Sequence, residues 1–266
     1  GKLQITASNG NETIGQLVDS VEIVEEGKVV IPFSFLKSAA QVSGEITMKS
    51  DNVNVTIKKG RTKLASTVMD TEQYPKMPNE KPAYQLRYTG EDWKEIVEAT
   101  AYAAATSESR PTLRGVHIQV TEEGQSFVCT DSKRLARVKY PKAEVAEELA
   151  ITLPAESLRN TSAIFDNEKP VIVMGFRNRV AMMNSNMIYT AMALEGNYPD
   201  TSRLIPEAYE QEIEISKEEL DGAIKLLKTL SEKKIVKAAF SSEGIVLSIN
   251  EEVANGEVVV NVNSEG

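Results

Sequence analysis

The chain offers few side chains for catalysis, because its 266 residues include one histidine and one cysteine. His117 lies in an alternating run, on the face opposite to Val116 and Ile118, where a histidine is usually a surface residue. Cys129 has the pattern of a small buried strand residue, and there is no second histidine to activate its thiol. Glycine-rich phosphate loops, His-Glu-x-x-His and Gly-x-Ser-x-Gly do not occur. Carboxylates are numerous, and the sequence neither locates nor excludes an acid–base pair among them. The residues give no positive support for an enzyme, and we expect no metal and no cofactor.

The charge of the chain is acidic overall but unevenly distributed. Its 30 Lys and Arg against 39 Asp and Glu give a formal net charge of −9, which argues against unselective coating of nucleic acid. Basic residues nevertheless gather around Lys58–Lys63, within residues 133–142, and on one helical face at Lys225 and Lys228. Such clusters are usually ordinary solvated surface. Basic helices that follow a phosphate backbone, however, need no side chains that read bases.

The spacing of apolar residues predicts an α+β fold with antiparallel sheets. Alternating runs such as Leu3–Ile5 and Val53–Ile57 are typical of half-buried strands. Helical spacing instead occurs at residues 35–40, 93–101, 158–165 and 220–230. Thr89 with Asp92, and Ser216 with Glu219, are spaced as capping boxes that start two of these helices. We expect no targeting segment and no membrane span, since no apolar stretch approaches the roughly 20 residues required.

Several landmarks recur at a spacing of roughly 120 residues. Ile31-Pro32 corresponds to Leu153-Pro154, and Tyr74-Pro75 corresponds to Tyr198-Pro199. The two capping boxes follow the same spacing. A repeat of this length suits tandem copies of one α+β domain rather than a solenoid. We therefore predict three domains, covering residues 1–82, 83–211 and 212–266.

Two motifs resemble a known family. The run Phe127–Ala136, F-V-C-T-D-S-K-R-L-A, is similar to the signature A-T-D-G-H-R-L-A of bacterial sliding clamps, the β subunits of replicative DNA polymerase III. The run Leu194–Pro206 resembles that family's G-x-[FY]-P-D-x-x-x-[LVI]-[LIV]-P segment. Val30–Leu36 and Lys59–Leu64 are supporting matches, so the resemblance covers essentially the whole chain. The chain departs from the signature at Ser132-Lys133, where the family has Gly-His. The resemblance also implies that the first and third domains are incomplete here.

The resemblance implies tandem DNA-clamp domains, with antiparallel sheets outside and helices on the inner face. Clamps of this family are head-to-tail homodimers closed into a ring around duplex DNA, which they hold without sequence specificity. We accordingly expect a cytoplasmic processivity factor that is not itself an enzyme, but a non-catalytic accessory subunit of a DNA-directed DNA polymerase (nucleotidyltransferase) holoenzyme. The strand at Arg61–Ser66 and the helix region at Leu227–Leu230 are candidate ring contacts. Helical spacing and the family's DNA-approaching loop place these residues toward DNA: Lys37, Lys94, Arg110, Arg114, Arg159, Lys225 and Lys228.

The family also binds short peptides of the polymerase catalytic subunit, the clamp loader and repair proteins, in a pocket between its second and third domains. Residue by residue, the resemblance implies a pocket wall made of Leu113, Thr130, Ser132, Lys133, Arg134, Leu135, Pro199, Arg203 and Leu204. Leucine and proline would accept apolar anchors, while Arg134 and Arg203 would orient backbone or acidic groups. Core packing is the competing interpretation of Leu113 and Leu135. Two other functions stay open, a clamp-like peptide-binding module that does not encircle DNA and an unrelated α+β enzyme, the second disfavoured by the single histidine.

Overall fold

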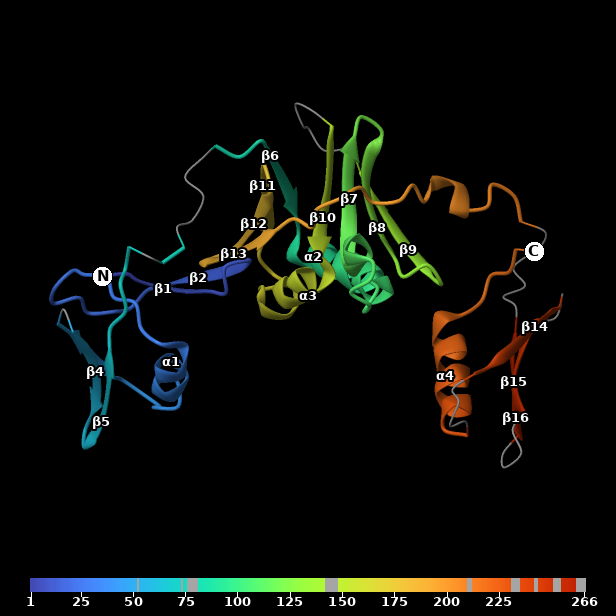
Figure 1. Cartoon of the computed structure of the whole chain (residues 1–266). Helices are drawn as coiled ribbons and strands as arrows, with labels where there is room; N and C mark the ends of the chain where they lie inside the picture. The colour runs from blue at the N-terminus through green and yellow to red at the C-terminus, as the bar shows by residue number, and fades with distance from the viewer. Residues whose placement is uncertain are drawn as a thin grey trace. The chain divides into compact units, whose positions relative to one another are not determined.

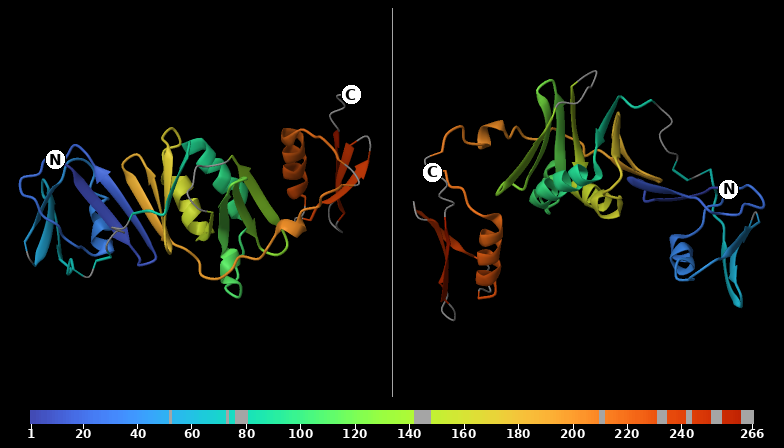
Figure 2. Two further views of the ribbon diagram at one scale, coloured as in Figure 1. Left: turned by 90° about the horizontal axis from the view of Figure 1, so that it is seen from above. Right: turned by 180° about the vertical axis from the view of Figure 1, so that it is seen from behind.

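The chain folds into antiparallel sheets with a few helices (Figures 1 and 2). The computed structural model describes residues 1–51, 53–72, 74–75, 81–141, 148–209, 212–230, 235–241, 244–250 and 255–261. Contacts divide the chain into two compact units, Gly1–Pro199 and Asp200–Gly266. In the described segments, no helix is both long enough and apolar enough to cross a membrane. The α+β fold class is confirmed, and the division into three domains stays a prediction.

The described helices agree with the four segments of helical spacing. The helices are α1 (Phe33–Ala39), α2 (Gly90–Thr100), α3 (Ala155–Ile164) and α4 (Lys217–Lys228), with 3-10 turns η1 (Ala101–Ala103), η2 (Pro111–Arg114) and η3 (Ser202–Leu204). The strands are β1 (Leu3–Ser8), β2 (Glu12–Val18), β3 (Thr47–Ser50), β4 (Asn54–Lys59), β5 (Thr62–Thr67), β6 (Tyr84–Tyr88), β7 (Gly115–Thr121), β8 (Gly124–Thr130), β9 (Leu135–Tyr140), β10 (Leu149–Pro154), β11 (Val171–Phe176), β12 (Arg179–Asn184), β13 (Met187–Met192), β14 (Lys237–Ser241), β15 (Gly244–Asn250) and β16 (Asn255–Asn261).

Both predicted helix starts are confirmed. Thr89 Oγ1 accepts a hydrogen bond from the Asp92 N–H at 3.0 Å, and Ser216 Oγ accepts one from the Glu219 N–H at 3.3 Å. Each bond satisfies a backbone donor that the first turn of a helix leaves without a partner. The Asp92 carboxylate also accepts a hydrogen bond from the Tyr140 hydroxyl at 2.6 Å, which ties the start of α2 to the end of β9.

Each described helix is followed by three antiparallel strands, and two such units interlock in the middle of the chain. The strand before α2, β6, pairs with β11, whereas the strand before α3, β10, pairs with β7. The strand that precedes the helix of each unit therefore joins the sheet that contains the other unit's three strands, with β6 beside β11 and β10 beside β7. The repeat of roughly 120 residues seen in the sequence contains two of these helix-and-three-strand units. The structural repeat is thus half as long as the sequence landmarks suggested.

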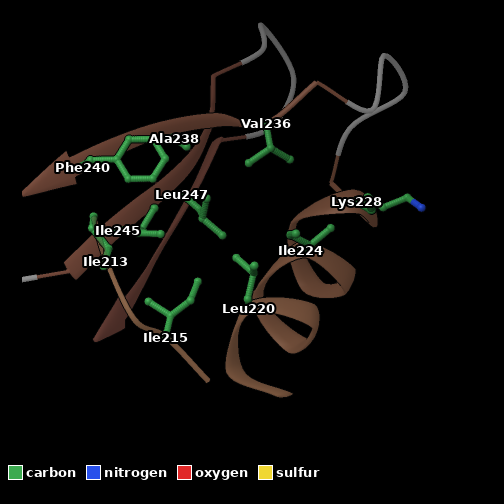
Figure 3. A pocket seen from close by; sticks show the side chains of 10 residues that line it. All are labelled: Ile213, Ile215, Leu220, Ile224, Lys228, Val236, Ala238, Phe240, Ile245 and Leu247. Carbon is green, nitrogen blue, oxygen red and sulfur yellow. The ribbon is translucent and has the colours of Figure 1, made fainter. Parts of the chain in front are cut away.

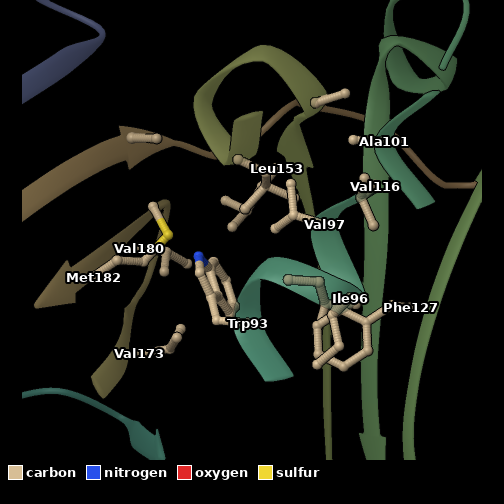
Figure 4. Close-up of a cluster of buried hydrophobic side chains, with 14 of the residues drawn as sticks. Trp93, Ile96, Val97, Ala101, Val116, Phe127, Leu153, Val173, Val180 and Met182 are labelled. Atoms are coloured by element: carbon tan, nitrogen blue, oxygen red, sulfur yellow. The ribbon is translucent and has the colours of Figure 1, made fainter. Parts of the chain in front are cut away.

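The largest core lies between the two interlocked sheets and under α2 and α3 (Figure 4). Trp93 is 1% exposed, and its Nε1 donates a hydrogen bond to Thr161 Oγ1 of α3 at 3.0 Å. Figure 4 shows its ring near Val173 and Val180 of one sheet, with Phe127 and Leu153 of the other sheet in the same cluster. Burying a large aromatic ring contributes several kcal/mol, about 25 cal/mol per Å² of apolar surface. This contact fixes α2 and α3 side by side.

The β1–β2 hairpin extends the sheet of the middle units. Strand β2 pairs with β13, giving the order β1-β2-β13-β12-β11-β6. Glu12, at the start of β2, accepts hydrogen bonds from the buried side chains of Ser157 and Tyr189, the latter at 2.7 Å. Residues on both sides of the predicted boundary at 82/83 therefore share one sheet, which explains why they belong to one compact unit.

Two smaller cores complete the described part of the chain. Helix α1 packs on β3-β4-β5 through Phe35, Val55 and Ile57. In the second unit, α4 packs on β14-β15-β16, and Leu227 is 1% exposed. Leu227 is therefore part of its own core, so only its neighbours Leu226 and Leu230 present apolar surface at the predicted ring contact.

Candidate functional site

The turn that joins β8 to β9 is held by a set of short-range hydrogen bonds. Thr130 Oγ1 donates to the Arg134 carbonyl at 2.7 Å and accepts from the Ser132 N–H at 3.1 Å. Asp131 Oδ1 accepts from the N–H groups of Lys133 at 2.9 Å and Arg134 at 3.0 Å. These backbone donors favour the charged carboxylate and hold the pKa of Asp131 below its ordinary value. The turn is therefore a defined structure that presents Ser132, Lys133 and Arg134 to solvent.

Ser132 explains why the similar family signature has glycine at this position. Its φ is +74°, in the left-handed region that costs a non-glycine residue about 1–2 kcal/mol. Its hydroxyl oxygen accepts a hydrogen bond from Arg110 Nη1. Ser132 thus keeps the backbone geometry suited to glycine and adds a contact that glycine lacks.

Arg134 is oriented by a carboxylate and an aromatic ring. Its Nε lies 3.1 Å from Asp131 Oδ2, and its guanidinium carbon lies 5.6 Å from the centroid of the Tyr102 ring. Although both partners lie close to it, the Arg134 side chain is 57% exposed, so the guanidinium remains accessible. A guanidinium held in this way can donate hydrogen bonds to a carboxylate or a peptide carbonyl.

The two predicted leucines of the first unit differ in exposure. Leu113, in η2, is 5% exposed, its N–H donates to the Arg110 carbonyl at 3.1 Å, and its carbonyl accepts from the Ala105 N–H. Leu135 is half-buried at the start of β9. Burial of Leu113 agrees with the core-packing interpretation, whereas Leu135 retains surface for a ligand.

The second motif meets the first at Tyr198. The Thr130 N–H donates to the Tyr198 hydroxyl oxygen at 3.0 Å, and the Tyr198 ring stacks on the His117 ring with centroids 4.7 Å apart and planes 4° from parallel. His117 is therefore half-buried beneath Tyr198, and its interpretation as a surface residue is wrong. Alternation along β7 places His117 on the outer face as expected, but Tyr198 covers that part of the face.

The structure brings part of the predicted pocket together. Thr130, Ser132, Lys133, Arg134 and Leu135 form one turn, and Tyr198 links this turn to the exposed Pro199. Arg203 and Leu204 are exposed on η3, which belongs to the second unit, so their place in the pocket stays a prediction. Arg110, predicted to face DNA, contacts Ser132 of the predicted pocket.

The residues predicted to face DNA all lie on helices or on the loop around η2. Lys37 is exposed on α1, with its Nζ 5.9 Å from the Phe33 ring centroid. Arg159 is exposed on α3, and its Nη2 donates to the carbonyl of Ala101 at 3.3 Å. Arg114 forms an exposed ion pair with Glu108 at 3.7 Å.

Acidic neighbours reduce the positive charge of two helices. Lys94 is half-buried on α2, which also carries the exposed Glu91, Glu95 and Glu98. On α4, Lys225 pairs with Asp221 at 2.6 Å, and both side chains are more than half exposed. Exposed pairs of this kind contribute at most about 1 kcal/mol, so they leave Lys225 free to exchange partners. The assignment of these lysines to DNA stays a prediction.

The second unit contains an open apolar groove of about 720 Å³ between α4 and its sheet (Figure 3). Leu220, Ile224 and Phe240 line it, and Lys228 is the predicted site residue at its edge. By the spacing of the capping boxes, Trp93 and Val97 of α2 correspond to Leu220 and Ile224, and both are 1% exposed in the first unit. The groove is therefore an uncovered face of this unit's core.

The Cys129 thiol is not poised for covalent chemistry. Burial raises the pKa of the Cys129 thiol to about 12, and its Sγ donates to the Gly115 carbonyl at 3.3 Å. Cys129 is therefore a structural residue, as the sequence predicted. Within the described ranges, no group of three or more His, Cys, Asp or Glu side chains could hold a metal ion.

Sequence reasoning missed three residues of this site. Tyr198 stands inside the second motif, but nothing in the pattern indicated that it contacts Thr130. Asp131 stands inside the first motif, where its spacing of two and three residues from the N–H groups that it binds was a usable signal for a turn. Tyr102 lies outside both motifs, and its contact with Arg134 depends on tertiary structure alone.

Comparison with known proteins points to one family. Residues 89–200 match the family described as "DNA polymerase III beta subunit, central domain". The chain is 27% identical over 256 residues to the "Beta sliding clamp" of Streptococcus pneumoniae, covering 94% of this chain and 65% of that protein. It is 32% identical over 219 residues to the Staphylococcus aureus "Beta sliding clamp", covering 80% of this chain and 58% of that protein.

Solved structures agree with these matches. The beta subunit of DNA polymerase from Streptococcus pyogenes superposes with a TM-score of 0.86 at 26% identity, covering 98% of this chain and 73% of that one. The Bacillus subtilis sliding clamp superposes with a TM-score of 0.87 at 24% identity, with the same coverage, and supports the fold. The chain thus spans about two thirds or less of the curated relatives. Together with the two motifs meeting at Tyr198, these matches show that residues 89–200 match the DNA polymerase III beta subunit central domain and that the chain is similar to bacterial beta sliding clamps along most of its length.

Proposed function

We propose that this protein is a sliding-clamp processivity factor, which encircles duplex DNA and tethers the replicative polymerase. The observation that carries the proposal is the match to beta sliding clamps along 94% of the chain, through both compact units. The proposed role is non-catalytic: the protein is an accessory subunit of the DNA polymerase III holoenzyme. Its proposed location is the bacterial cytoplasm, where that holoenzyme works.

Retention on DNA by a closed ring requires only weak contacts. A ring cannot leave duplex DNA sideways, so lysine and arginine need only screened contacts with phosphates, which align the DNA without reading bases. The exposed Arg159 on α3, next to α2, supports this role in the first unit. The net charge of −9 then describes mainly the rest of the surface, and a negative exterior limits nonspecific adhesion to DNA.

The proposed pocket takes short peptides from the polymerase catalytic subunit, the clamp loader and repair proteins. Its best-supported part is the β8–β9 turn, with the accessible Arg134 and the half-buried Leu135. Arg203 and Leu204 complete the proposed wall. The turn supports the proposal because its backbone is fixed in advance, which lowers the entropic cost of binding a flexible peptide.

The proposed assembly is a head-to-tail homodimer of chains with three clamp domains, which here cover residues 1–82, 83–211 and 212–266. The Arg61–Ser66 strand supports this proposal, because β5 is an edge strand of its sheet and edge strands can pair with another chain. Leu226 and Leu230 are 59% and 40% exposed, and they offer apolar surface at the other proposed contact.

Charge reversal on α4 tests the proposed DNA contact. We expect Lys225→Glu with Lys228→Glu in the full-length protein to shorten retention on circular DNA at least severalfold after loading, since two cations become anions. Arg137→Glu with Lys139→Glu is the matched control, because both residues are exposed on strand β9. Gel filtration of the loaded DNA measures retention. Equal retention of the α4 variant and the control would remove Lys225 and Lys228 from the proposed DNA-facing set.

A further inference from the structure

The segment Leu194–Pro199 is attached to three neighbouring strands in succession. The Leu194 N–H donates to the Thr152 carbonyl of β10 at 2.8 Å. Four residues later, the Tyr198 ring stacks on His117 of β7, and its hydroxyl accepts from the Thr130 N–H of β8. Because β10, β7 and β8 are adjacent in the sheet, the segment crosses the outer face strand by strand.

The crossing covers only one part of that outer face. Thr152 pairs with His117, and His117 pairs with Val128, so these three side chains share the outer face of the sheet. Thr152 and Val128 are each 4% exposed. Two residues along β7 from His117, on the same face, Gln119 is exposed. The outer face is therefore buried where Tyr198 crosses it and exposed beyond that point.

His117 is itself held in place. Its Nδ1 lies 2.9 Å from Thr152 Oγ1, within hydrogen-bonding distance. This contact at one edge fixes the orientation of the imidazole ring, and the nearly parallel Tyr198 ring stacks on its face. Aromatic pairs of this kind contribute about 0.5–1.5 kcal/mol beyond the area they bury.

Thr130 connects the stacked rings of His117 and Tyr198 to the proposed peptide pocket. Its N–H contacts Tyr198, while its hydroxyl contacts the Arg134 carbonyl and the Ser132 N–H. The same tyrosine directly precedes Pro199, another proposed pocket residue. The stack on His117 thus connects the β8–β9 turn to the segment that carries Pro199.

We propose that His117 is a positioning residue for the peptide pocket: its ring is the platform for Tyr198, and through Tyr198 it fixes the β8–β9 turn relative to Pro199. This proposal rests on the proposed function, because it assigns His117 to the same pocket. His117 does not contact the peptide itself. It acts through Tyr198, whose ring and hydroxyl have separate partners.

Variants at His117 and Tyr198 separate the stack from the hydrogen bonds. His117→Ala removes the platform, whereas His117→Phe keeps an aromatic face and loses only the contact with Thr152. Tyr198→Phe keeps the stack and leaves the Thr130 N–H without its acceptor. Gln119→Ala, on the same face of β7, is the matched control.

Binding to the full-length protein is measured by fluorescence anisotropy, with a labelled peptide of the C-terminal residues of the host's polymerase catalytic subunit. We expect His117→Ala to weaken binding by about three- to tenfold, the range that a lost aromatic pair implies. His117→Phe should recover most of the affinity, and Gln119→Ala should bind as the unmodified protein does. If His117→Ala binds as tightly as Gln119→Ala, or if His117→Phe is as weak as His117→Ala, the proposal is wrong.

A second measurement does not depend on the peptide. In ¹⁵N-labelled protein, the amide resonances of Thr130 and Ser132 should shift in His117→Ala and return toward their original positions in His117→Phe. Unmoved resonances would overturn the positioning role even if binding changed. If the unmodified protein does not bind the peptide while the resonances behave as expected, the proposed pocket fails and the connection from His117 to the turn stands.

Discussion

At the scale of single residues, we predict that glycine at position 132 gives a more stable protein than alanine, the reverse of the usual order. Inside a helix or strand, a protein with glycine is less stable than one with alanine by about 0.5–1 kcal/mol. A left-handed backbone, in contrast, costs a non-glycine residue about 1–2 kcal/mol. With φ at +74°, Ser132→Gly should exceed Ser132→Ala in free energy of unfolding by about 1 kcal/mol. At Ser126, in strand β8, we expect the usual order, with Ser126→Ala more stable than Ser126→Gly. Urea denaturation of the four variants, followed by the fluorescence of the single tryptophan, measures the difference; a less stable Ser132→Gly would contradict the account.

His117 makes a prediction about pH. Burial lowers the pKa of His117 below its ordinary value of 6.5, and Tyr198, whose pKa is raised to about 12, stays neutral beside it. Below pH 6.5 the unfolded chain therefore binds a proton that the folded chain resists, so the free energy of unfolding falls as the pH drops through this window. Urea denaturation at pH 7.5 and 5.5 should show a smaller loss for His117→Phe than for the unmodified protein. Equal losses would contradict the lowered pKa.

The sequence predicted part of the site at this scale. The two motifs assigned Thr130, Arg134 and Pro199 to the proposed pocket, because the residue types and spacing of a motif can be recognised in a single sequence. The stack of His117 on Tyr198 was out of reach, because these residues lie far apart in sequence and alternation alone places His117 on a solvent face. The later segment that carries Tyr198 covers this part of the outer face, and its path cannot be read from the alternation along β7.

At the scale of elements, Glu12 holds the β1–β2 hairpin against α3 and β13. Its carboxylate accepts hydrogen bonds from Ser157 and Tyr189, whose side chains are 0% and 5% exposed. Glu12→Ala leaves both hydroxyls without this acceptor, at about 1–3 kcal/mol for each buried group. We expect a loss of about 2–4 kcal/mol in urea denaturation, with faster amide exchange in β2 and β13. The exposed Gln16→Ala, also in β2, should cost no more than about 0.5 kcal/mol, and equal losses for the two variants would contradict this role of Glu12.

The helices were predictable at this scale and the strand pairing was not. The capping residues Thr89 and Ser216 act within one turn of their helices, so local sequence contains the information. The exchange of β6 and β10 between two sheets depends on pairings that alternation does not specify, since either strand would bury its apolar face in either sheet. The landmarks of the repeat likewise indicated a spacing of about 120 residues and concealed the shorter structural unit.

At the scale of the whole molecule, the proposed peptide pocket includes Arg203 and Leu204, which the resemblance to sliding clamps assigns to it. We expect Arg203→Ala with Leu204→Ala to weaken binding of the polymerase C-terminal peptide about tenfold or more, because an exposed arginine and leucine would each lose their contact with it. Arg177→Ala with Val24→Ala, which removes an exposed arginine and an exposed apolar residue elsewhere, is the control. Fluorescence anisotropy gives both affinities. Unchanged affinity of the Arg203 and Leu204 variant would remove these residues from the pocket.

The net charge shows how function depends on the distribution of residues over the whole molecule. An excess of acidic residues disfavours a protein that coats nucleic acid, but a ring needs positive charge only where its helices face the DNA. Composition alone could not distinguish these cases. The repeat and the two motifs were needed to suggest a ring.

In the proposed function, the protein tethers a polymerase to DNA as a sliding clamp. The most direct measurement is the length of product that the replicative polymerase makes on primed circular single-stranded DNA, with the clamp loader, ATP and the full-length protein. We expect the protein to lengthen the products made in a single binding event, and we expect this effect to be lost on short linear templates, from which a ring slides off. Products of unchanged length on circular DNA, with the loader active on a known clamp, would contradict the proposed function.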